Sequence, residues 1–563
     1  MVSNFKIKKT MKNKFIYLAV LAAFGFASCE PEFENEVNAD YTAGEADFTS
    51  YVAIGNSLTA GYMDGTVYRS GQQYSFPNLL AQKFALVGGG EFTQPSFADD
   101  INNVGGLNLG GFPIASSRLI IDASQGRPEN IAGTIGIEVS ALQATAYNNM
   151  GVPGAKSFHL VAPGYGNVAG VALGQSNPYF VRHATSPSAT VLGDAMTKNP
   201  TFFTNWIGAN DVLSYATNGG ALTTGDGNTA AEDHNSTGNT NPATYGSNDI
   251  TNSNVFASVY STLITTLTSG GAKGVVATVP SVTSIPYFTT VPYAPLSAQG
   301  LGAGLVPAGS DTATQIAAGT AAMNQLNTAL YNNLDAVFTA FSEPNRVNPL
   351  NPNTANPILI WDVDAADRTA QITGGLMMQG VPAPVAAEIG AAFGRARQAT
   401  ANDLVVLPAS GVIGTPNANA TATLVSLGAN LNGVSYPMAN RWVLTSNEQS
   451  KVASATTAYN NAIISIATAN DLAIADMNAI LNELVSGLRI ETGQVYTANY
   501  FSGASTEGLV LFSLDGVHPN ARGYSVIANE IIKVINRHYN ANLPLNNPSY
   551  FPGINILPVN NPI

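Results

Sequence analysis

The stretch Tyr51-Val-Ala-Ile-Gly-Asn-Ser-Leu-Thr-Ala-Gly61 is an apolar run that stops at a Gly-Asn-Ser turn. A short apolar run ended by a turn predicts a buried β-strand, here with Ser57 just past its carboxyl end. In open α/β sheets, ligands bind outside the carboxyl ends of the strands. Ser57 is therefore a candidate nucleophile, although a Gly-x-Ser turn alone is usually only a turn. The prediction depends on finding its partners.

Candidate partners occur further along the chain. Asn210, in Gly208-Ala-Asn-Asp211, follows the apolar run 202–207 and carries two side-chain N–H donors. The segment Asp515-Gly-Val-His-Pro519 places a carboxylate three residues before an imidazole. Asp515 can then hold one ring nitrogen of His518 while the other faces Ser57. This set provides a nucleophile, a base and a group that orients the base.

A Gly/Pro turn, Asn148-Asn-Met-Gly-Val-Pro-Gly-Ala155, lies between these segments. A glycine lets a backbone N–H approach an oxyanion without an intervening Cβ. Gly151 and Gly154, three residues apart in this turn, are both candidates for such a donor.

In their order, these four segments resemble the motif blocks of the SGNH (GDSL-like) hydrolase family, which centre on Ser, Gly, Asn and His. The matching residues are Gly55-Asn-Ser-Leu58, Val152-Pro-Gly-Ala155, Gly208-Ala-Asn-Asp211 and Asp515-Gly-Val-His518. The resemblance implies Ser57 as nucleophile, His518 as general base and acid, and Asp515 as its orienter. It also implies an oxyanion hole from the Ser57 N–H, the Gly154 N–H and the Asn210 amide. Asn56 stands where the best-known form of the family has Asp.

The rest of the chain predicts an α/β fold. Residues 256–267 read as a helix that stops at Gly270-Gly271, and residues 274–280 read as the next buried strand. This strand and helix alternation predicts βαβ units and a parallel sheet. The resemblance implies a flavodoxin-like, three-layer α/β/α fold with a central parallel sheet. Because the last motif lies beyond residue 510, a large inserted subdomain is expected, and we expect it to shape the acyl or leaving-group pocket.

The predicted organisation has six parts. They are a lipoprotein signal peptide (1–28), an acidic tether (29–46), the first part of the hydrolase domain (47–280), the inserted lid subdomain (281–446), the last part of the hydrolase domain (447–539) and a C-terminal tail (540–563). Within the insertion and after it, helices are predicted over 317–341 and 450–467, and a strand over 471–476. The segment 217–252, rich in Gly, Asn, Thr and Ser, predicts a long exposed loop.

Of the five histidines, only His518 has an acid three residues before it. His159, His183 and His234 are expected to be surface or hydrogen-bonded residues, and His538 to lie at the end of a helix. Pro519 suits the first helical position, which predicts His518 as the N-cap of the helix that follows.

The N-terminus reads as an export signal, with Lys6 to Lys14 before an apolar segment of 15–26 and the small residues Ala27-Ser28. Either Met1 or Met11 can be its start. Cys29, the only cysteine, follows as in the lipobox of bacterial lipoproteins, with Phe26 where Leu is usual. The acidic run of 30–36 resembles export signals of surface lipoproteins in the Bacteroidetes. These resemblances imply lipidation at Cys29 and a place in the cell envelope, at the outer membrane.

Cleavage after residue 28 removes five lysines and no acid, which takes the formal net charge from −13 to −18. Such a charge disfavours nucleic acid and anionic membranes, so membrane contact is expected through the lipid alone. The predicted function is that of a serine esterase or lipase-type acylhydrolase that needs no metal or organic cofactor. Its substrate would be a lipid, a short acyl ester or an acylated glycan. The alternatives are a carbohydrate O-deacetylase and a non-catalytic, glycan-binding lipoprotein.

Overall fold

The computed structural model describes residues 40–497 and 507–561. The chain divides into Met1–Thr42 and Ala43–Ile563, and the fold presented below is that of the second unit. The predicted signal segment and Cys29 lie outside the described residues. Among the described residues, no helix combines the length and apolar character that crossing a bilayer requires.

Five parallel strands form the central sheet, in the order β6-β1-β7-β8-β13. Their bounds are β1 Tyr51–Gly55, β6 Asn149–Gly151, β7 Phe202–Trp206, β8 Lys273–Ala277 and β13 Ala473–Ala475. The predicted α/β class and central parallel sheet are confirmed, as are the strands expected over 274–280 and 471–476. Numbered along the chain, the five strands lie in the order 2-1-3-4-5, so the order reverses direction between β1 and β7.

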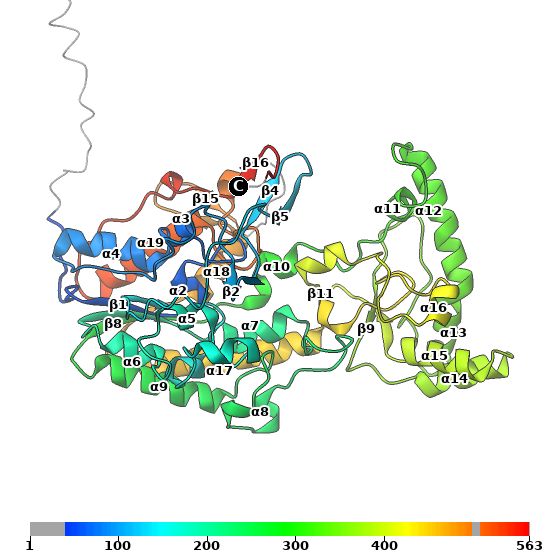
Figure 1. The fold of residues 1–563 in the computed structure, drawn as a ribbon. Helices are drawn as coiled ribbons and strands as arrows, with labels where there is room; N and C mark the ends of the chain where they lie inside the picture. The colour runs from blue at the N-terminus through cyan, green and yellow to red at the C-terminus, as the bar shows by residue number, and fades with distance from the viewer. Residues whose placement is uncertain (1–39, 498–506, 562–563) are drawn as a thin grey trace, which may run out of the picture. The chain divides into compact units, whose positions relative to one another are not determined.

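Helices cover both faces of this sheet (Figure 1). Tyr51 and Ala53 of β1 pack on one face against α4 (Phe76–Phe84) and α19 (Ala521–His538), while Val52 and Ile54 pack on the other. The second face is covered by α6 (Val191–Met196), α9 (Ser253–Thr268) and α17 (Ser446–Ala469). Strands buried on both faces read as continuous apolar runs, which explains why residues 51–54 show no polar alternation.

Between β8 and α17, the chain adds elements that do not join the central sheet. They are α10 Pro286–Thr289, α11 Ala298–Ala303, α12 Thr312–Leu326, α13 Asn332–Ala340, β9 Leu359–Trp361, α14 Thr369–Met378, α15 Ala383–Phe393, β10 Ala396–Gln398, β11 Leu404–Val405, α16 Ala422–Ser426 and β12 Val443–Leu444. The helix predicted over 317–341 is present as α12 and α13, joined by one π-helical turn.

Shorter elements make up the rest of the described fold. They are α2 Ser57–Ala60, α3 Arg69–Gln72, β2 Leu107–Leu109, β3 Phe112–Ala115, β4 Leu119–Asp122, β5 Arg127–Asn130, α5 Pro178–His183, α7 Asn210–Thr217, α8 His234–Thr237, α18 Met477–Ser486, β14 Leu488–Arg489, β15 Val495–Tyr496 and β16 Ile556–Leu557. In the C-terminal tail, β16 pairs with β4.

The segment 217–252 is mostly irregular and many of its residues are exposed, as predicted, but others are buried. Its polar residues bond to one another and to the core, so the segment folds back on the protein. His234 is buried, and its Nε2 lies 2.9 Å from Asp249 Oδ2 while its ring stacks on Tyr245 at 3.8 Å. The Asp249 carbonyl in turn accepts a hydrogen bond of 2.6 Å from the Nζ of Lys156.

Two other local predictions need correction. Helix α19 starts at Ala521 and is capped by Asn520, whose side chain accepts the Gly523 N–H at 2.9 Å. The backbone of His518 instead accepts a hydrogen bond from the Ser513 N–H, so His518 precedes the helix rather than capping it. His183 is buried between the rings of Tyr147 and Phe180, and in the described structure its Nδ1 has no hydrogen-bond partner.

Candidate active site

Ser57, His518 and Asp515 form a continuous hydrogen-bonded chain at the carboxyl end of β1. His518 Nε2 lies 2.8 Å from Ser57 Oγ, and His518 Nδ1 lies 2.9 Å from Asp515 Oδ2. Ser57 is the first residue of α2, directly after the strand and the Asn56 turn. The structure therefore brings Ser57 together with an Asp–His pair that lies more than 450 residues later in the sequence.

The loop that carries His518 fixes the Asp515 carboxylate. Its Oδ1 accepts the N–H groups of Val517 and His518 at 2.9 and 2.8 Å, and its Oδ2 accepts the Gly65 N–H at 3.1 Å. Burial alone would raise the pKa of Asp515, but His518 and these N–H donors lower it overall. Because the ionised carboxylate only accepts hydrogen bonds, the Nδ1–H of His518 donates to it. His518 Nε2 is then free to accept the Ser57 proton.

A second loop, residues 62–68, is hydrogen-bonded to the loop that bears Asp515 and His518. Asp64 donates its N–H to Ser513 Oγ at 3.0 Å, and its carboxylate accepts the Leu514 N–H at 3.1 Å and the Tyr68 hydroxyl at 3.0 Å. The Tyr62 ring lies 4.5 Å from the His518 ring, centroid to centroid. Sequence reasoning missed Tyr62, Asp64 and Gly65. Their nearness to the first motif is the only signal that could have pointed to them.

Three N–H groups are available as oxyanion donors beside Ser57. Within the described residues, the backbone N–H groups of Ser57 and Gly154 donate no hydrogen bond. Asn210 uses one side-chain N–H on the Ala155 carbonyl at 2.9 Å, which leaves the second. Gly154 and Asn210 line the same cavity as His518.

The alternative glycine, Gly151, has a different position. It lies in β6, its N–H bonds to Asn149 Oδ1 at 3.0 Å, and a Cβ there would come within 2.3 Å of the Ala60 backbone nitrogen. Its role is therefore close packing of β6 on α2. Gly154 has φ +79° and no close neighbour, so the geometry favours Gly154 as the donor.

The cavity that contains His518 has a volume of about 980 Å³. It is lined partly by residues of the 217–252 segment, among them Tyr245, and by His159. His159 Nδ1 accepts the Lys156 N–H at 3.1 Å, so the ring proton is on Nε2. Burial and the nearby Lys156 charge lower the pKa of His159 to about 3, which keeps the imidazole neutral.

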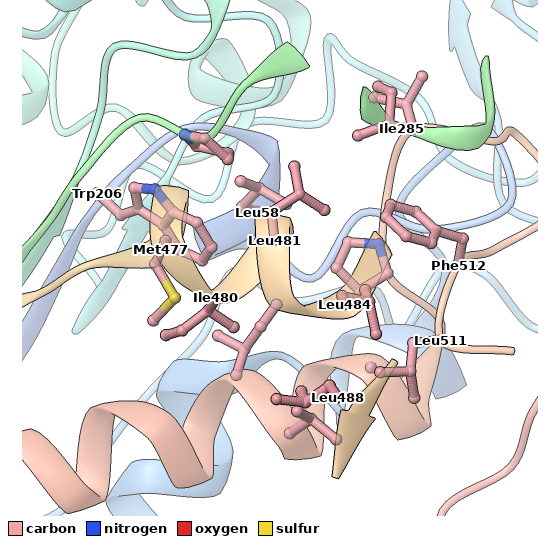
Figure 2. Close-up of a pocket in the computed structure, with 16 residues that line it drawn as sticks. Leu58, Trp206, Ile285, Met477, Ile480, Leu481, Leu484, Leu488, Leu511 and Phe512 are labelled. Atoms are coloured by element: carbon pink, nitrogen blue, oxygen red, sulfur yellow. The ribbon is translucent and has the colours of Figure 1, made fainter. Parts of the chain in front are cut away.

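A smaller pocket of about 110 Å³ is lined by chain neighbours of the candidate nucleophile and base. Leu58, which follows Ser57, and Val517 and Pro519, which flank His518, line it. Figure 2 shows apolar side chains of α18 and of residues 511–512 converging on the same space. Val517 lines both cavities, so both lie beside the His518 loop.

The insertion contributes little to either cavity near Ser57. Of residues 281–446, only Ile285 lines the small pocket and only Tyr287 lines the large one. The rest of the insertion lines neither cavity, and its expected role in shaping an acyl or leaving-group pocket stays a prediction. Within residues 40–497 and 507–561, no group of three or more His, Cys, Asp or Glu side chains is placed to hold a metal ion.

No protein-family model, curated protein or solved structure matches this chain. The interpretation of the site consequently depends on its residues and geometry.

Proposed function

We propose that this protein is a serine-dependent carboxylic ester hydrolase of the SGNH type. The observation that carries the proposal is the hydrogen-bonded chain from Ser57 through His518 to Asp515, which borders a cavity shared with Gly154 and Asn210. The 2-1-3-4-5 strand order is that of flavodoxin-like sheets, and Ser57 follows β1 at the point where the order reverses. Both features support the family assignment.

The proposed reaction has two steps. Ser57 Oγ attacks the ester carbonyl carbon and its proton moves to His518 Nε2, while Asp515 stabilises the imidazolium. The tetrahedral intermediate then breaks its C–O bond to the alcohol, which leaves with the proton from Nε2. Water attacks the acyl-enzyme with His518 again as base, and the acid and free Ser57 are released.

Negative charge on the carbonyl oxygen would be stabilised by the N–H groups of Ser57 and Gly154 and the second amide N–H of Asn210. Donors held in place before reaction stabilise this charge without reorganisation in the transition state.

The two cavities support an assignment of the two sides of the substrate. The small pocket is almost wholly apolar and adjoins Leu58, so it suits a short or medium acyl chain. The larger cavity, with polar groups such as Gln175 and Ser247 in its lining, suits the alcohol. Its size keeps the carbohydrate O-deacetylase alternative open, because a sugar can serve as the alcohol.

The test is hydrolysis of p-nitrophenyl esters from acetate to decanoate by the wild-type protein and by Ser57→Ala. We expect turnover that is lost in the variant, with an optimum at short to medium chains. Should neither protein hydrolyse these esters or acetylated oligosaccharides, the non-catalytic, glycan-binding alternative would replace the proposal.

Membrane attachment through a lipid on Cys29 is a separate proposal, supported by the sequence around that residue. Incorporation of a labelled fatty acid by the wild-type chain, and none by Cys29→Ser, is the expected result. Equal labelling of both would contradict it.

A further inference from the structure

A third cavity, of about 280 Å³, lies where residues 226–228 meet the inserted segment. It shares no lining residue with the two cavities beside Ser57. Its volume is close to the lower end, about 300 Å³, of the range usual for small-molecule sites. The cavity is therefore separate from the proposed active site and suits a ligand of about one or two rings.

Two aromatic side chains with free polar groups line this cavity. Trp361, at the end of β9, and Tyr436 are both half-buried. In the described structure, neither the Trp361 indole N–H nor the Tyr436 hydroxyl bonds to another protein group, and neither is a fully buried atom, so both are open to solvent and to a ligand. Aromatic rings offer apolar faces, and their N–H and O–H groups are normally bonded when they are covered. A ligand here would have to provide both an apolar face and hydrogen-bond acceptors.

The other polar groups of the lining are mainly acceptors. Glu388 of α15 accepts the Thr421 hydroxyl, and Asp226 accepts two N–H groups of Asn228, yet each carboxylate has further lone pairs. Among the described residues, no Lys, Arg or His lines the cavity. Anionic ligands are thus disfavoured, and the ligand should present hydrogen-bond donors to Glu388 and Asp226.

We propose that this cavity binds a neutral oligosaccharide. One sugar ring would place its C–H face against Trp361 and Tyr436, and its hydroxyls would donate to Glu388 and Asp226. A sugar hydroxyl also accepts, which matches the free indole N–H and phenol O–H. A quaternary ammonium or a metal ion would suit the carboxylates and the rings, but it has no acceptor for these two donors, so the sugar fits the lining better.

Calorimetry on the full chain carrying Ser57→Ala tests this proposal without turnover. The probes are neutral tetrasaccharides of glucose, mannose, xylose and N-acetylglucosamine, with tetramethylammonium chloride and calcium chloride as cation probes. We expect saturable binding of at least one tetrasaccharide, weakened about tenfold or more by Glu388→Gln and by Trp361→Phe. Trp442→Phe, which changes a half-buried indole outside the cavity, is the matched control and should bind as before.

Intrinsic fluorescence provides a second readout, because Trp361 is one of only three tryptophans. A sugar-induced change should be absent in Trp361→Phe and present in Trp442→Phe. The proposal is overturned if no tetrasaccharide binds, if only the cations bind, or if both tryptophan variants bind equally well. Since Ser57 plays no part in these measurements, their outcome is independent of the esterase proposal.

Discussion

At the scale of single residues, Asn210 supplies the sharpest test of the proposed oxyanion hole. One of its amide N–H groups bonds to the Ala155 carbonyl, and the other is available to the substrate. Loss of one oxyanion donor typically lowers kcat by about 10²–10³-fold. We expect Asn210→Ala to show a decrease of this size in p-nitrophenyl ester hydrolysis, with little change in KM.

The control for this variant is Asn218→Ala. Asn218 follows the same helix, and its amide donates a comparable hydrogen bond of 2.9 Å to the Ser214 carbonyl, but it does not line the cavity. Its loss should affect stability by about 1 kcal/mol and leave kcat unchanged. Full activity of Asn210→Ala would remove Asn210 from the proposed mechanism.

His159 tests the assignment of the large cavity to the alcohol. Its neutral ring presents Nε2–H as a donor, while its stacking on Tyr165 at a centroid distance of 4.4 Å fixes the ring plane. His159→Phe keeps the stacking and removes the donor. For glycerol monobutyrate we expect KM to rise about tenfold, and for p-nitrophenyl butyrate, which has no hydroxyls on its alcohol, we expect no change. Equal effects on both esters would contradict the assignment.

The sequence predicted the site residues that belong to motifs and missed those that act through distant contacts. Ser57, Asn210 and Asp515 follow apolar runs or neighbour a histidine in the chain, so local pattern was enough to select them as candidates. Asp64 matters because it meets Leu514, 450 residues later. Pairing of that kind depends on how the whole chain folds, and no local spacing reveals it.

At the scale of elements, the hydrogen bonds that join the 62–68 and 513–518 loops predict a pH dependence of stability. Burial raises the pKa of Asp64 to about 6, with a smaller contribution from Asp515. An ordinary Asp has a pKa near 3.9, so Asp64 holds its proton more often in the folded than in the unfolded protein between pH 4 and 6. The contribution of Asp64 to the free energy of unfolding should therefore fall as pH rises through this range, by up to about 3 kcal/mol, while carboxyls with a lowered pKa, such as Asp515, contribute in the opposite direction.

Asp64→Asn isolates this effect, because the amide can still accept the Leu514 N–H. We expect urea unfolding of the variant to show a weaker loss of stability between pH 4 and 6. The slope should not vanish, since burial also raises the pKa of Glu448 to about 7. An unchanged slope in Asp64→Asn would mean that Asp64 does not titrate as described.

Helix α18 lines the small pocket, which predicts that its side chains limit the length of the acyl chain. Leu484 of this helix is buried against the small pocket, whereas its neighbour Val485 is 55% exposed and does not line the pocket. Leu484→Trp should fill the pocket and lower kcat/KM for p-nitrophenyl hexanoate about tenfold or more, with acetate hydrolysis little changed. The same substitution at Val485 is the control. A parallel loss for both esters would indicate general damage rather than a filled acyl site.

Element prediction succeeded for long periodic segments and failed where polar residues are buried. Helix α17 and strand β8 have clear patterns, and both are present close to the predicted residues. The 217–252 segment has the composition of a loop, but the His234–Asp249 pair and its bond to Lys156 draw it into the protein. Amino-acid composition shows how polar a segment is, but it does not predict which of its polar groups are buried and hydrogen-bonded in the fold.

At the scale of the whole molecule, the apolar core links the central sheet to the inserted segment. One hydrophobic cluster contains Ile54 and Val276 of the sheet together with Ile360 and Val405 of the insertion. Hydrogen bonds reinforce the connection, since the buried Asn440 side chain donates to the Gly219 carbonyl at 2.6 Å and to Glu448 at 2.8 Å. A second hydrophobic cluster, which includes Phe338, lies entirely within the insertion.

The shared cluster predicts that the insertion and the central sheet unfold together. Ile360 is fully buried, so Ile360→Ala should lower the free energy of unfolding by about 2–5 kcal/mol. If the core is one cooperative unit, thermal loss of esterase activity and the change in tryptophan fluorescence should shift to lower temperature by the same amount. Ile316→Ala, at a 42%-exposed position of the same insertion, should shift neither. The contrary outcome is that Ile360→Ala lowers the temperature of the fluorescence transition but leaves the temperature of inactivation unchanged. The insertion would then unfold alone, because the sheet would keep the proposed active site after the shared cluster is lost.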